Sequence, residues 1–318
     1  MKIKKQYPIN QSPFYKLSNH QRLANILGTD LRTLSRVVKR RDENYKFGHT
    51  DSGRAIQIPK AQLLRFHARI NRLLVRISTP DYLVSGVKGR SHVYNAKQHV
   101  GEVAVAKTDI AKFYPSTTTE IVRKGLRKKF KCSNDIAKTL ASLCSVNGHV
   151  PTGSPISQSL CFIVNAPVFD HLNIYARSRG LTFSLYVDDL TFSGKVLPKN
   201  FLSYVANYLE RTRGYRCHKF RTYGNEKEKV ITGVVVKSDN IQLKNSQRLK
   251  IFKLFKSKAY YSNAALKNDP LTVKYFQELI GHLFSAGQIS PRYKQFGREV
   301  VEERKLLEVR ALNQNIGR

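Results

Sequence analysis

The spacing of apolar residues predicts a helical start to the chain, followed by a hairpin. Over roughly the first 40 residues, apolar side chains recur every three or four positions, as on one face of a helix, at Leu23, Ile26, Leu27, Leu31, Leu34 and Val38. Two short apolar runs, 45–47 and 55–58, then flank a turn that contains Gly53, and Pro59 follows the second run. This pattern is typical of a β-hairpin.

Residues 61–77 form the clearest predicted helix. One stripe along it is apolar, and beside that stripe arginines recur at intervals of three and four: Arg65, Arg69, Arg72 and Arg76. No acidic residue stands three or four positions away to pair with them. A solvated basic face is the simpler explanation of such a stripe, but the missing acidic partners favour contact with phosphates.

The remaining pattern predicts a mixed α and β body followed by a small helical domain. The expected elements are strands at 103–110, 182–187 and 190–193, helices within 120–144, 155–178 and 200–213, and a hairpin of 230–237 with 241–243. From about residue 245 the sequence becomes helical and basic, with apolar residues interleaved among lysines and arginines. The last expected helix runs from Pro291 to Leu312.

The charge of the chain points to a polyanionic partner. Its 318 residues include 56 Lys and Arg against 22 Asp and Glu, so the net charge is 56 − 22 = +34 at pH 7. A chain this basic repels itself unless a polyanion neutralises it, which favours a nucleic-acid-binding protein. Binding to anionic lipid would need a basic amphipathic surface helix or a lipid anchor, and the sequence offers neither.

Composition otherwise indicates an ordinary globular protein that is not tied to a membrane. No apolar run approaches the ~20 residues that span a bilayer, and the basic N-terminus has no apolar segment of a signal peptide after it. The four cysteines, Cys132, Cys144, Cys161 and Cys217, form no C-x-x-C pair. Buried free thiols are therefore expected rather than a structural zinc site.

The most informative residues are the adjacent carboxylates Asp188 and Asp189, between the apolar runs 183–187 and 190–193. Aspartate is common in turns, so a lone pair would carry little weight. Adjacent carboxylates repel each other, however, and each raises the pKa of the other unless a cation is present. A chain with so few acidic residues has no electrostatic need for two here, which favours a divalent metal.

Asp109, at the end of the strand predicted at 103–110, is a third candidate ligand. If that strand lies beside the predicted hairpin, Asp109 and Asp188 converge. Three carboxylates can then hold two Mg²⁺ ions about 4 Å apart, the arrangement used for in-line nucleotidyl transfer. One ion would activate a primer hydroxyl, and the other would hold the triphosphate of a nucleotide.

These motifs resemble those of reverse transcriptases. The segment 109–116 (DIAKFYPS) is similar to the family's motif A, and 186–189 (YVDD) to its Y-x-D-D motif. The segment 151–158 (PTGSPISQ) stands where the substrate-binding block P-Q-G-x-P-x-S-P is expected. The order and spacing agree across roughly residues 40–240.

Two further features resemble the retron branch of that family. Asn95 and His99 fit an N-A-x-x-H element before motif A. Thr232 and Gly233, in ITG at 231–233, are similar to the retron V-T-G element. The compact length of the chain also fits this branch.

The resemblance implies a right-hand polymerase of mixed α and β class. It implies N-terminal helices and fingers in 1–100, a palm with an RRM-like antiparallel sheet in 101–240 (with a fingers segment at about 120–150) and a helical thumb in 241–318.

The resemblance also implies roles for individual residues. Asp109, Asp188 and Asp189 would bind two Mg²⁺ ions and catalyse, and Tyr114 would be a steric gate that selects deoxynucleotides. The other implied dNTP-binding residues are Arg54, Gly153, Gln158 and Arg221. The implied nucleic-acid-binding residues are Asn95, His99, Thr232, Gly233, the four arginines of the stripe, Arg248, Lys250 and Lys253.

The implied activity is synthesis of branched multicopy single-stranded DNA (msDNA) from a guanosine 2′-OH of a structured noncoding RNA. That RNA serves as template and primer, the substrates are dNTPs, and the setting is the bacterial cytoplasm. Such systems resemble antiphage modules in which the enzyme and its DNA restrain an effector protein or toxin encoded nearby.

The sequence departs from the family pattern at several positions. Thr152 replaces a glutamine, Gln158 replaces a proline, and Lys112 stands where many retron enzymes have aspartate. Arg221 occupies the apparent motif D position in place of a lysine, and arginine is a poor proton donor. Val187 replaces the commoner alanine.

Three other functions stay open at this point. A G-x-x-x-S-Q ending, at 153–158, is also similar to reverse transcriptases of diversity-generating retroelements. A scaffold that binds nucleic acid and sequesters an effector would need no intact carboxylates. An RNA-dependent RNA polymerase would carry paired aspartates as well, but a gate at Tyr114 disfavours ribonucleotides.

Overall fold

The computed structural model describes residues 6–262 and 269–316, with the side chains of the last helix described as far as Leu306. The chain divides into two compact units. Unit 1 comprises residues 1–91 and 104–223, and unit 2 comprises 92–103 and 224–318. The boundaries predicted near 100 and 240 separate fingers, palm and thumb. The two compact units are a different division of the chain and do not test these boundaries.

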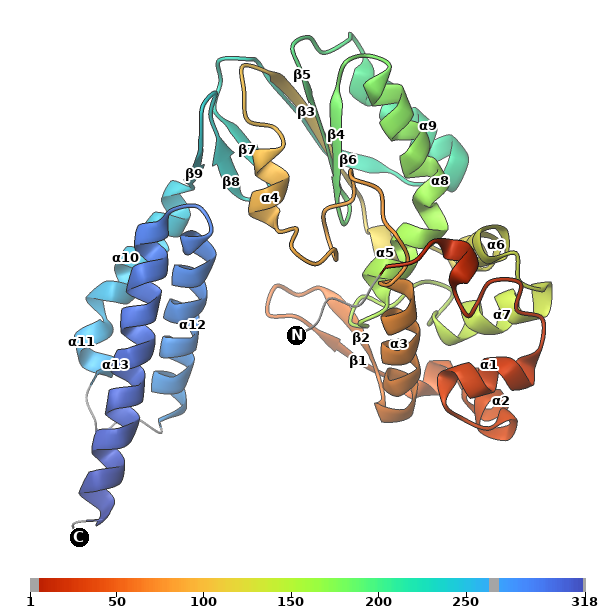
Figure 1. Cartoon of the computed structure of the whole chain (residues 1–318), viewed down its shortest axis with the longest axis horizontal. Coiled ribbons are helices and arrows are strands. Elements are labelled where there is room, and N and C mark those ends of the chain that lie inside the picture. The colour runs from red at the N-terminus through yellow and green to blue at the C-terminus, as the bar shows by residue number, and fades with distance from the viewer. Residues whose placement is uncertain (1–5, 263–268, 317–318) are drawn as a thin grey trace. The chain divides into compact units, whose positions relative to one another are not determined.

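Unit 1 begins with short helices (Figure 1), and side-chain caps and a glycine set their ends. After the short 3₁₀ turn Ile9–Gln11, helix α1 (His20–Leu27) is capped by the Asn19 side chain and ends at Gly28, whose φ is 73°. Helix α2 (Leu31–Lys39) is capped in the same way by Asp30. Side-chain caps satisfy the free N–H groups of a first turn, and glycine tolerates the left-handed φ of a helix end.

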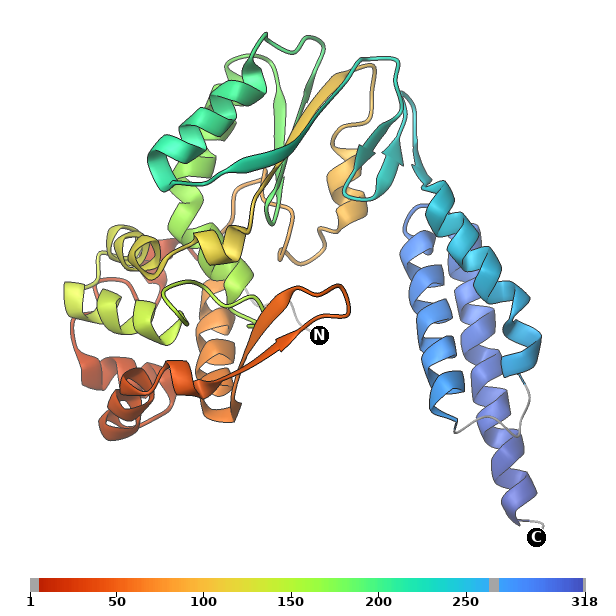
Figure 2. The ribbon, with the colours of Figure 1, turned by 180° about the vertical axis from the view of Figure 1, so that it is seen from behind.

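The predicted hairpin and helix follow in order (Figure 2). After the 3₁₀ turn Asp42–Asn44, strand β1 (Tyr45–His49) pairs antiparallel with β2 (Ala55–Pro59). Helix α3 (Ala61–Leu74) comes next and buries Phe66, Ile70 and Leu73. It ends three residues before the predicted end at 77, because Ile77 instead joins a parallel bridge with Tyr7.

The centre of unit 1 is a four-stranded antiparallel sheet. Its strands are β3 (Ala104–Ile110), β4 (Thr182–Tyr186), β5 (Asp189–Gly194) and β6 (Cys217–Tyr223), in the order β4-β5-β3-β6. The connections contain helices α5 (Phe113–Ser116), α6 (Thr119–Phe130), α7 (Asn134–Leu143), α8 (Ser157–Arg177) and α9 (Phe201–Arg213). A β-α-β-β-α-β chain with this strand order is the ferredoxin-like arrangement, so the expected RRM-like sheet and mixed fold class are confirmed.

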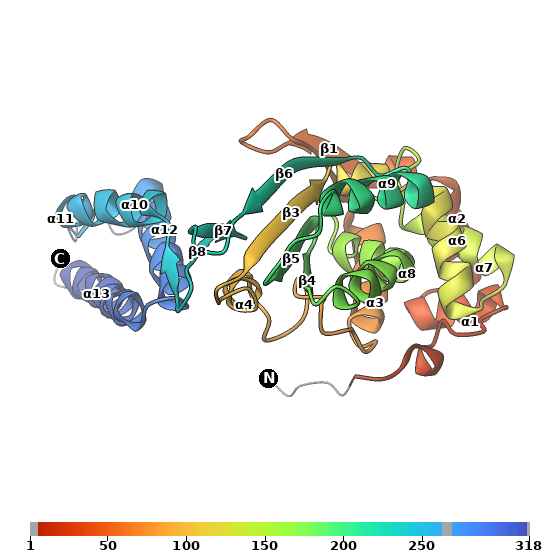
Figure 3. The same cartoon turned by 90° about the horizontal axis from the view of Figure 1, so that it is seen from above.

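Helices α8 and α9 pack on one face of this sheet (Figure 3). On that face, the rings of Phe183 and Phe192 stack with centroids 4.7 Å apart, and Phe201 of α9 meets Phe192 edge to face at 4.9 Å. Side chains alternate between the two faces of a strand. Along each strand, the residues that alternate with these core residues therefore point to the opposite face, which includes Asp109 and Asp189.

Unit 2 combines a short helix, a small sheet and a helical bundle. Helix α4 (His92–Lys97) contacts β8 of the three-stranded sheet β7 (Lys229–Ile231), β8 (Val234–Val236) and β9 (Ile241–Leu243). Helices α10 (Asn245–Lys256), α11 (Lys258–Tyr261), α12 (Pro270–Gly287) and α13 (Pro291–Ile316) follow. Leu279 and Leu283 of α12 are fully buried in a core of this unit's own.

Two sequence predictions about strands need correction. The strand expected at 230–237 is two strands, because Thr232 and Gly233 have φ values of 43° and 85° and reverse the chain between β7 and β8. Strand β6 was not predicted at all. It is mostly exposed, so it lacks the alternating apolar face that marks a half-buried strand.

The structure also bears on the cysteine and membrane predictions. All four cysteines are free thiols; Cys132, Cys144 and Cys161 are buried as predicted, and Cys217 is half-buried. Among the described residues, no helix combines the length and the hydropathy needed to cross a bilayer.

Candidate active site

The register of the central sheet brings two of the predicted carboxylates together. Asp109 of β3 stands opposite Asp189 of β5, and Lys107 stands opposite Thr191 two residues along. Because side chains alternate along a strand, these four residues share the face that α8 and α9 leave uncovered. The strand predicted at 103–110 thus lies beside the predicted hairpin, which was the condition for Asp109 and Asp188 to converge.

The third carboxylate, Asp188, lies in the tight turn between β4 and β5. Tyr186 pairs with Asp189, so Val187 and Asp188 make a two-residue connection. The Asp188 carbonyl accepts a hydrogen bond from the Ile110 N–H at 3.0 Å, which ties the turn to the end of β3. Val187 has a φ of 61°, a left-handed conformation that β-branched residues rarely adopt.

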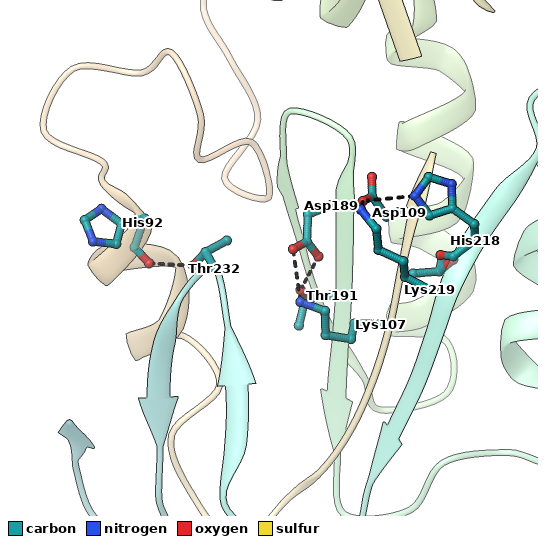
Figure 4. A network of polar contacts seen from close by, with 9 residues as sticks. His92, Lys107, Asp109, Asp189, Thr191, His218, Lys219 and Thr232 are labelled. Carbon is teal, nitrogen blue, oxygen red and sulfur yellow. Dashed lines mark hydrogen bonds and ion pairs between the residues drawn. The ribbon is translucent and has the colours of Figure 1, made fainter. Parts of the chain in front are cut away.

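Two lysines neutralise the carboxylates (Figure 4). Lys107 Nζ lies 3.0 Å from Asp189 Oδ2, and Thr191 donates to Asp189 Oδ1 at 3.4 Å. Lys219 Nζ lies 2.6 Å from Asp109 Oδ2, with His218 Nε2 3.4 Å from the same oxygen. Lys219 was not predicted as a site residue, because the apolar pattern of the sequence does not reveal β6; Arg221 was the basic residue predicted in that segment.

Burial and charge at the turn disfavour ionisation of Asp188. Burial raises its pKa well above the usual range, and the negative charge of nearby Asp109 raises it further. Tyr114, on α5, is half-buried, and its pKa is raised by burial and by the Cys161 and Asp188 charges. The charge of Asp188 thus acts on the Tyr114 phenol, and the role of Tyr114 as a steric gate stays a prediction.

The carboxylate oxygens of this site suit a hard divalent cation, although Lys107 and Lys219 already form ion pairs with Asp189 and Asp109. Asp109 Oδ1 is buried and has no hydrogen-bond partner. Carboxylate oxygens are the ligands that Mg²⁺ prefers. Over residues 6–262 and 269–316, however, no three His, Cys, Asp or Glu side chains are grouped so that they could hold a metal ion. Metal binding would require Lys107 and Lys219 to release the oxygens that they contact.

The loop 151–158 is attached to the hairpin strand β2. The Thr152 N–H donates to Gln57 Oε1 at 3.1 Å, and the Thr152 hydroxyl donates to the Ala55 carbonyl at 2.9 Å. The Gly153 N–H donates to the Gln57 carbonyl at 3.2 Å. A Cβ on Gly153 would lie 2.8 Å from that carbonyl oxygen, so only glycine fits this close approach. Arg54 directly precedes β2, so the loop and Arg54 belong to adjoining segments.

Helix α3 holds the same loop from its other side. His67 is fully buried, its Nε2 lies 2.7 Å from the Leu143 carbonyl, and its Nδ1 lies 2.6 Å from Ser154 Oγ. A ring that donates from Nε2 to the carbonyl can accept the Ser154 hydroxyl at Nδ1. Burial lowers the pKa of His67 to about 4, so the ring is neutral at pH 7.

The predicted arginine stripe divides into two pairs. Arg69 Nε donates to the Ile26 carbonyl at 2.9 Å, and the Arg76 guanidinium stacks over the Tyr7 ring at 5.0 Å. These two arginines are half-buried, whereas Arg65 and Arg72 are exposed. Only the exposed pair presents its charge freely to a phosphate.

The remaining predicted dNTP-binding residues lie at different depths. Gln158, in the first turn of α8, packs its amide against Gly86, where an added Cβ would come within 2.9 Å of its Nε2. Arg221, on β6, is exposed and stands opposite Lys107 of β3. The structure thus places Gln158 in the first turn of α8, against Gly86, and Arg221 on the edge strand of the sheet.

The two retron-like elements lie together in unit 2. The Thr232 hydroxyl donates to the His92 carbonyl at 2.8 Å, which joins the turn at 232–233 to α4 (Figure 4). Asn95 and His99 are fully buried, so neither side chain is presented directly to a nucleic acid in this structure. The nucleic-acid-binding role predicted for Asn95 and His99 stays a prediction.

The cations predicted for the thumb lie on the exposed side of α10. Arg248, Lys250 and Lys253 are all exposed, and Lys250 pairs with Glu278 of α12 at 2.7 Å. The exposed apolar residues Leu249 and Phe252 lie on the same helix. Helix α10 therefore presents a surface of interleaved cations and apolar groups.

Comparison with known proteins finds retron reverse transcriptases among the sequence relatives. No family model matches the chain. It is 31% identical over 180 residues to the retron Se72 reverse transcriptase of Salmonella heidelberg, covering 54% of this chain and 47% of that protein. Identity is 28% over 147 residues to the retron Ec86 enzyme of Escherichia coli (46% of each), and 34% over 160 residues to the retron Mx65 enzyme of Myxococcus xanthus (44% and 37%).

Solved structures resemble the chain more distantly. Apo telomerase from Candida tropicalis aligns with a TM-score of 0.48 at 10% identity, over 86% of this chain and 57% of that one. Telomerase from Candida albicans with a fragment of telomeric RNA gives 0.43 at 12% identity, over 88% and 64%. The chain spans about half the length, or less, of the curated relatives that it matches. Over its matched half, the chain is related in sequence to the retron reverse transcriptases.

Proposed function

We propose that the chain is an RNA-directed DNA polymerase of retron type. The observation that carries this proposal is the pairing of Asp109 with Asp189 across β3 and β5, beside the turn that contains Asp188. Sequence similarity to retron reverse transcriptases supports the choice of reaction. Carboxylates on adjoining strands are suited to phosphoryl chemistry because they can share divalent cations.

The carboxylates would hold two Mg²⁺ ions, which supply activation of the attacking hydroxyl and charge neutralisation on the triphosphate. Before binding, Lys107 and Lys219 keep the Asp189 and Asp109 oxygens paired, so they limit repulsion in the metal-free site. Tyr114, half-buried near Asp188, would occupy the space that a ribose 2′-OH needs. Arg54, before β2, would contact the triphosphate through its guanidinium fork.

We further propose a structured noncoding RNA as both template and primer, with extension from a 2′-OH to give branched msDNA. The net charge of +34 and the exposed cations of α10 support a large polyanionic partner. In this proposal the complex acts in the bacterial cytoplasm and restrains an effector protein in antiphage defence.

A primer-extension assay tests the polymerase proposal. The purified chain should extend a DNA primer annealed to an RNA template when dNTPs and Mg²⁺ are supplied. Asp188→Asn/Asp189→Asn should reduce extension by at least about a thousandfold, because the metal ligands are lost. Asp135→Asn/Asp239→Asn changes the charge equally at exposed aspartates and should keep full activity. Extension that is the same in both double variants would contradict the proposed site.

A cellular experiment tests the retron assignment separately. The gene and its flanking DNA would be expressed in a bacterium, and small nucleic acids would be treated with RNase and debranching enzyme. A DNA that shifts on treatment, and is absent with Asp188→Asn/Asp189→Asn, is the expected result. Primer extension in vitro without branched DNA in cells would favour a diversity-generating reverse transcriptase. Nucleic-acid binding without any extension would favour a scaffold.

A further inference from the structure

The turn that contains Asp188 is supported from outside the central sheet by the segment 82–86. Its backbone runs parallel to the outer edge of β4, where Leu83 forms a bridge with Leu185. The Leu185 N–H donates to the Tyr82 carbonyl at 2.8 Å, and the Val84 N–H donates to the Leu185 carbonyl at 3.0 Å. These bonds fix the segment in register with the last residues before the turn.

At the next position, the segment hydrogen-bonds to the hairpin through the side chain of Ser85 instead of its backbone. Ser85 Oγ accepts a hydrogen bond from the Val187 N–H at 2.7 Å, and the Ser85 residue is 5% exposed. Gly86 then has a φ of 72°, and the chain turns away against the Gln158 amide. Ser85 is therefore the last contact of this segment with the hairpin, and it falls on the first residue of the turn.

The residue that Ser85 contacts is held in an unfavourable conformation. Val187 is β-branched and has a φ of 61°. Such a conformation costs free energy and persists only where the surroundings enforce it. The Ile110 N–H holds the turn through the Asp188 carbonyl, and Ser85 holds it through the Val187 N–H. The backbone of Val187 and Asp188 is thus fixed from both sides, with the Asp188 carboxylate close to that of Asp109 in the candidate site.

We propose that Ser85 is a positioning residue for the reaction: its hydroxyl holds the Val187–Asp188 turn in the strained conformation that sets the place of the Asp188 carboxylate. The proposal rests on the proposed polymerase function. Ser85 does not itself touch the reacting atoms. Its removal leaves the Val187 N–H unpaired and lets the turn relax, and small displacements of a reacting group are costly in rate.

The first measurement is amide hydrogen exchange in the metal-free full chain, followed by mass spectrometry of peptides that contain Val187. In Ser85→Ala, exchange at Val187 should be about tenfold faster, because one buried hydrogen bond is lost. Ser85→Thr keeps the hydroxyl and should retain slow exchange. The matched control is Ser12→Ala: Ser12 is also 5% exposed, and its Oγ accepts the Phe14 N–H far along the chain from the turn. Unchanged exchange in Ser85→Ala would overturn the proposal.

The second measurement is primer extension by the same proteins. Ser85→Ala should lower kcat about tenfold with the KM for dNTP within about twofold, and Ser85→Thr should restore kcat. In a Val187→Gly background, glycine adopts the positive φ without strain, so the turn no longer needs Ser85 to hold it. The additional decrease in kcat from Ser85→Ala should then be under about threefold. A purely structural serine would instead lower stability and leave kcat unchanged, as expected for Ser12→Ala.

The outcomes separate the two proposals. An active wild-type chain whose Ser85→Ala variant retains full kcat would overturn the role of Ser85 alone. Equal losses from Ser85→Ala in the wild-type and Val187→Gly backgrounds would also overturn it, because relief of strain would then have no effect. A folded wild-type chain that extends no primer would overturn the polymerase function, and the catalytic role of Ser85 with it.

Discussion

Single residues decide whether the carboxylates of the candidate site are available to a cation. Lys219 of β6 forms an ion pair with Asp109, and its φ of 56° is a left-handed conformation that is uncommon for a non-glycine residue. The Asp109 side chain is 19% exposed, so its charge is only partly screened by water. An ammonium group at this place therefore competes directly with any metal for the same oxygen.

Removing that ammonium should tighten metal binding. For Lys219→Met we expect the Kd for Mn²⁺, measured by electron paramagnetic resonance, to fall about three- to tenfold, since the uncompensated carboxylate attracts the cation more strongly. Lys237→Met is the matched control, because Lys237 also forms an ion pair, with Glu228 at 2.9 Å, in the other unit. Equal Kd values for Lys219→Met and wild type would show that Lys219 does not compete.

His67 makes the stability of unit 1 depend on pH. Burial lowers its pKa from 6.5 to about 4, so the unfolded chain binds more protons than the folded chain between these values. Its contribution is fully present above about pH 6.5 and is lost as the pH falls toward about 4. Between pH 7 and pH 5 the free energy of unfolding should drop by about 2 kcal/mol more in wild type than in His67→Gln, by urea denaturation. Parallel pH profiles for the two proteins would contradict this.

At the scale of elements, helix α3 combines two functions that its sequence did not distinguish. Arg69 of α3, and Arg76 just after its end, contact Ile26 and Tyr7, whereas Arg65 and Arg72 of α3 are exposed. Arg65→Ala/Arg72→Ala should weaken RNA binding and reduce the slope of log K against log salt by about 1.4, with little change in stability. Arg69→Ala/Arg76→Ala should lower the urea midpoint instead. Equal effects of the two pairs on the salt slope would argue against this division.

The contact between β2 and the loop at 151–158 gives a second prediction for an element. Gly153→Ala places a methyl group 2.8 Å from the Gln57 carbonyl oxygen, a backbone atom that cannot move without moving the strand. We expect a loss of about 1–3 kcal/mol in the free energy of unfolding and weaker primer extension. Gly224→Ala is the control, since nothing lies within 4 Å of its added Cβ. A Gly153→Ala protein as stable as the control would show that the loop is not held against β2.

The elements also show why part of the site could be predicted from the sequence and part could not. Strands β3, β4 and β5 have buried apolar positions, so their pattern revealed them and the carboxylates at their ends. Strand β6 is held by backbone pairing with β3 and is mostly exposed, so its pattern gives no strand signal and Lys219 was missed. The contact of Ser85 with Val187 joins residues 102 positions apart, and local periodicity carries no information on such a pair.

At the scale of the whole molecule, charge is the dominant constraint. The net charge is +34, and some of the cationic side chains also cluster at one place in unit 1. Five cationic side chains line a cavity of about 460 Å³ in unit 1, Lys124, Lys128, Lys129, Arg211 and Arg213, and one acidic residue, Glu120, lines it with them. Glu120 is already engaged by Arg123 and Lys124. Repulsion among such groups is stronger in the compact state than in the unfolded chain, so it opposes folding.

This repulsion predicts opposite effects of salt on the free and the RNA-bound chain. Raising NaCl from about 0.05 to 0.5 M shortens the Debye length from over 10 Å to about 4 Å, which screens repulsion and should raise the urea midpoint of the free chain. With a structured RNA in excess, the urea midpoint at low salt should be higher than that of the free chain, because bound RNA stabilises the folded state. The same increase in NaCl should then lower the midpoint, because salt weakens the binding of the RNA. A neutral osmolyte, sucrose, controls for general stabilisation and should raise both midpoints. A free chain whose midpoint is independent of NaCl would show that its positive charges are compensated within the fold, and the electrostatic argument for a polyanionic partner would then fail.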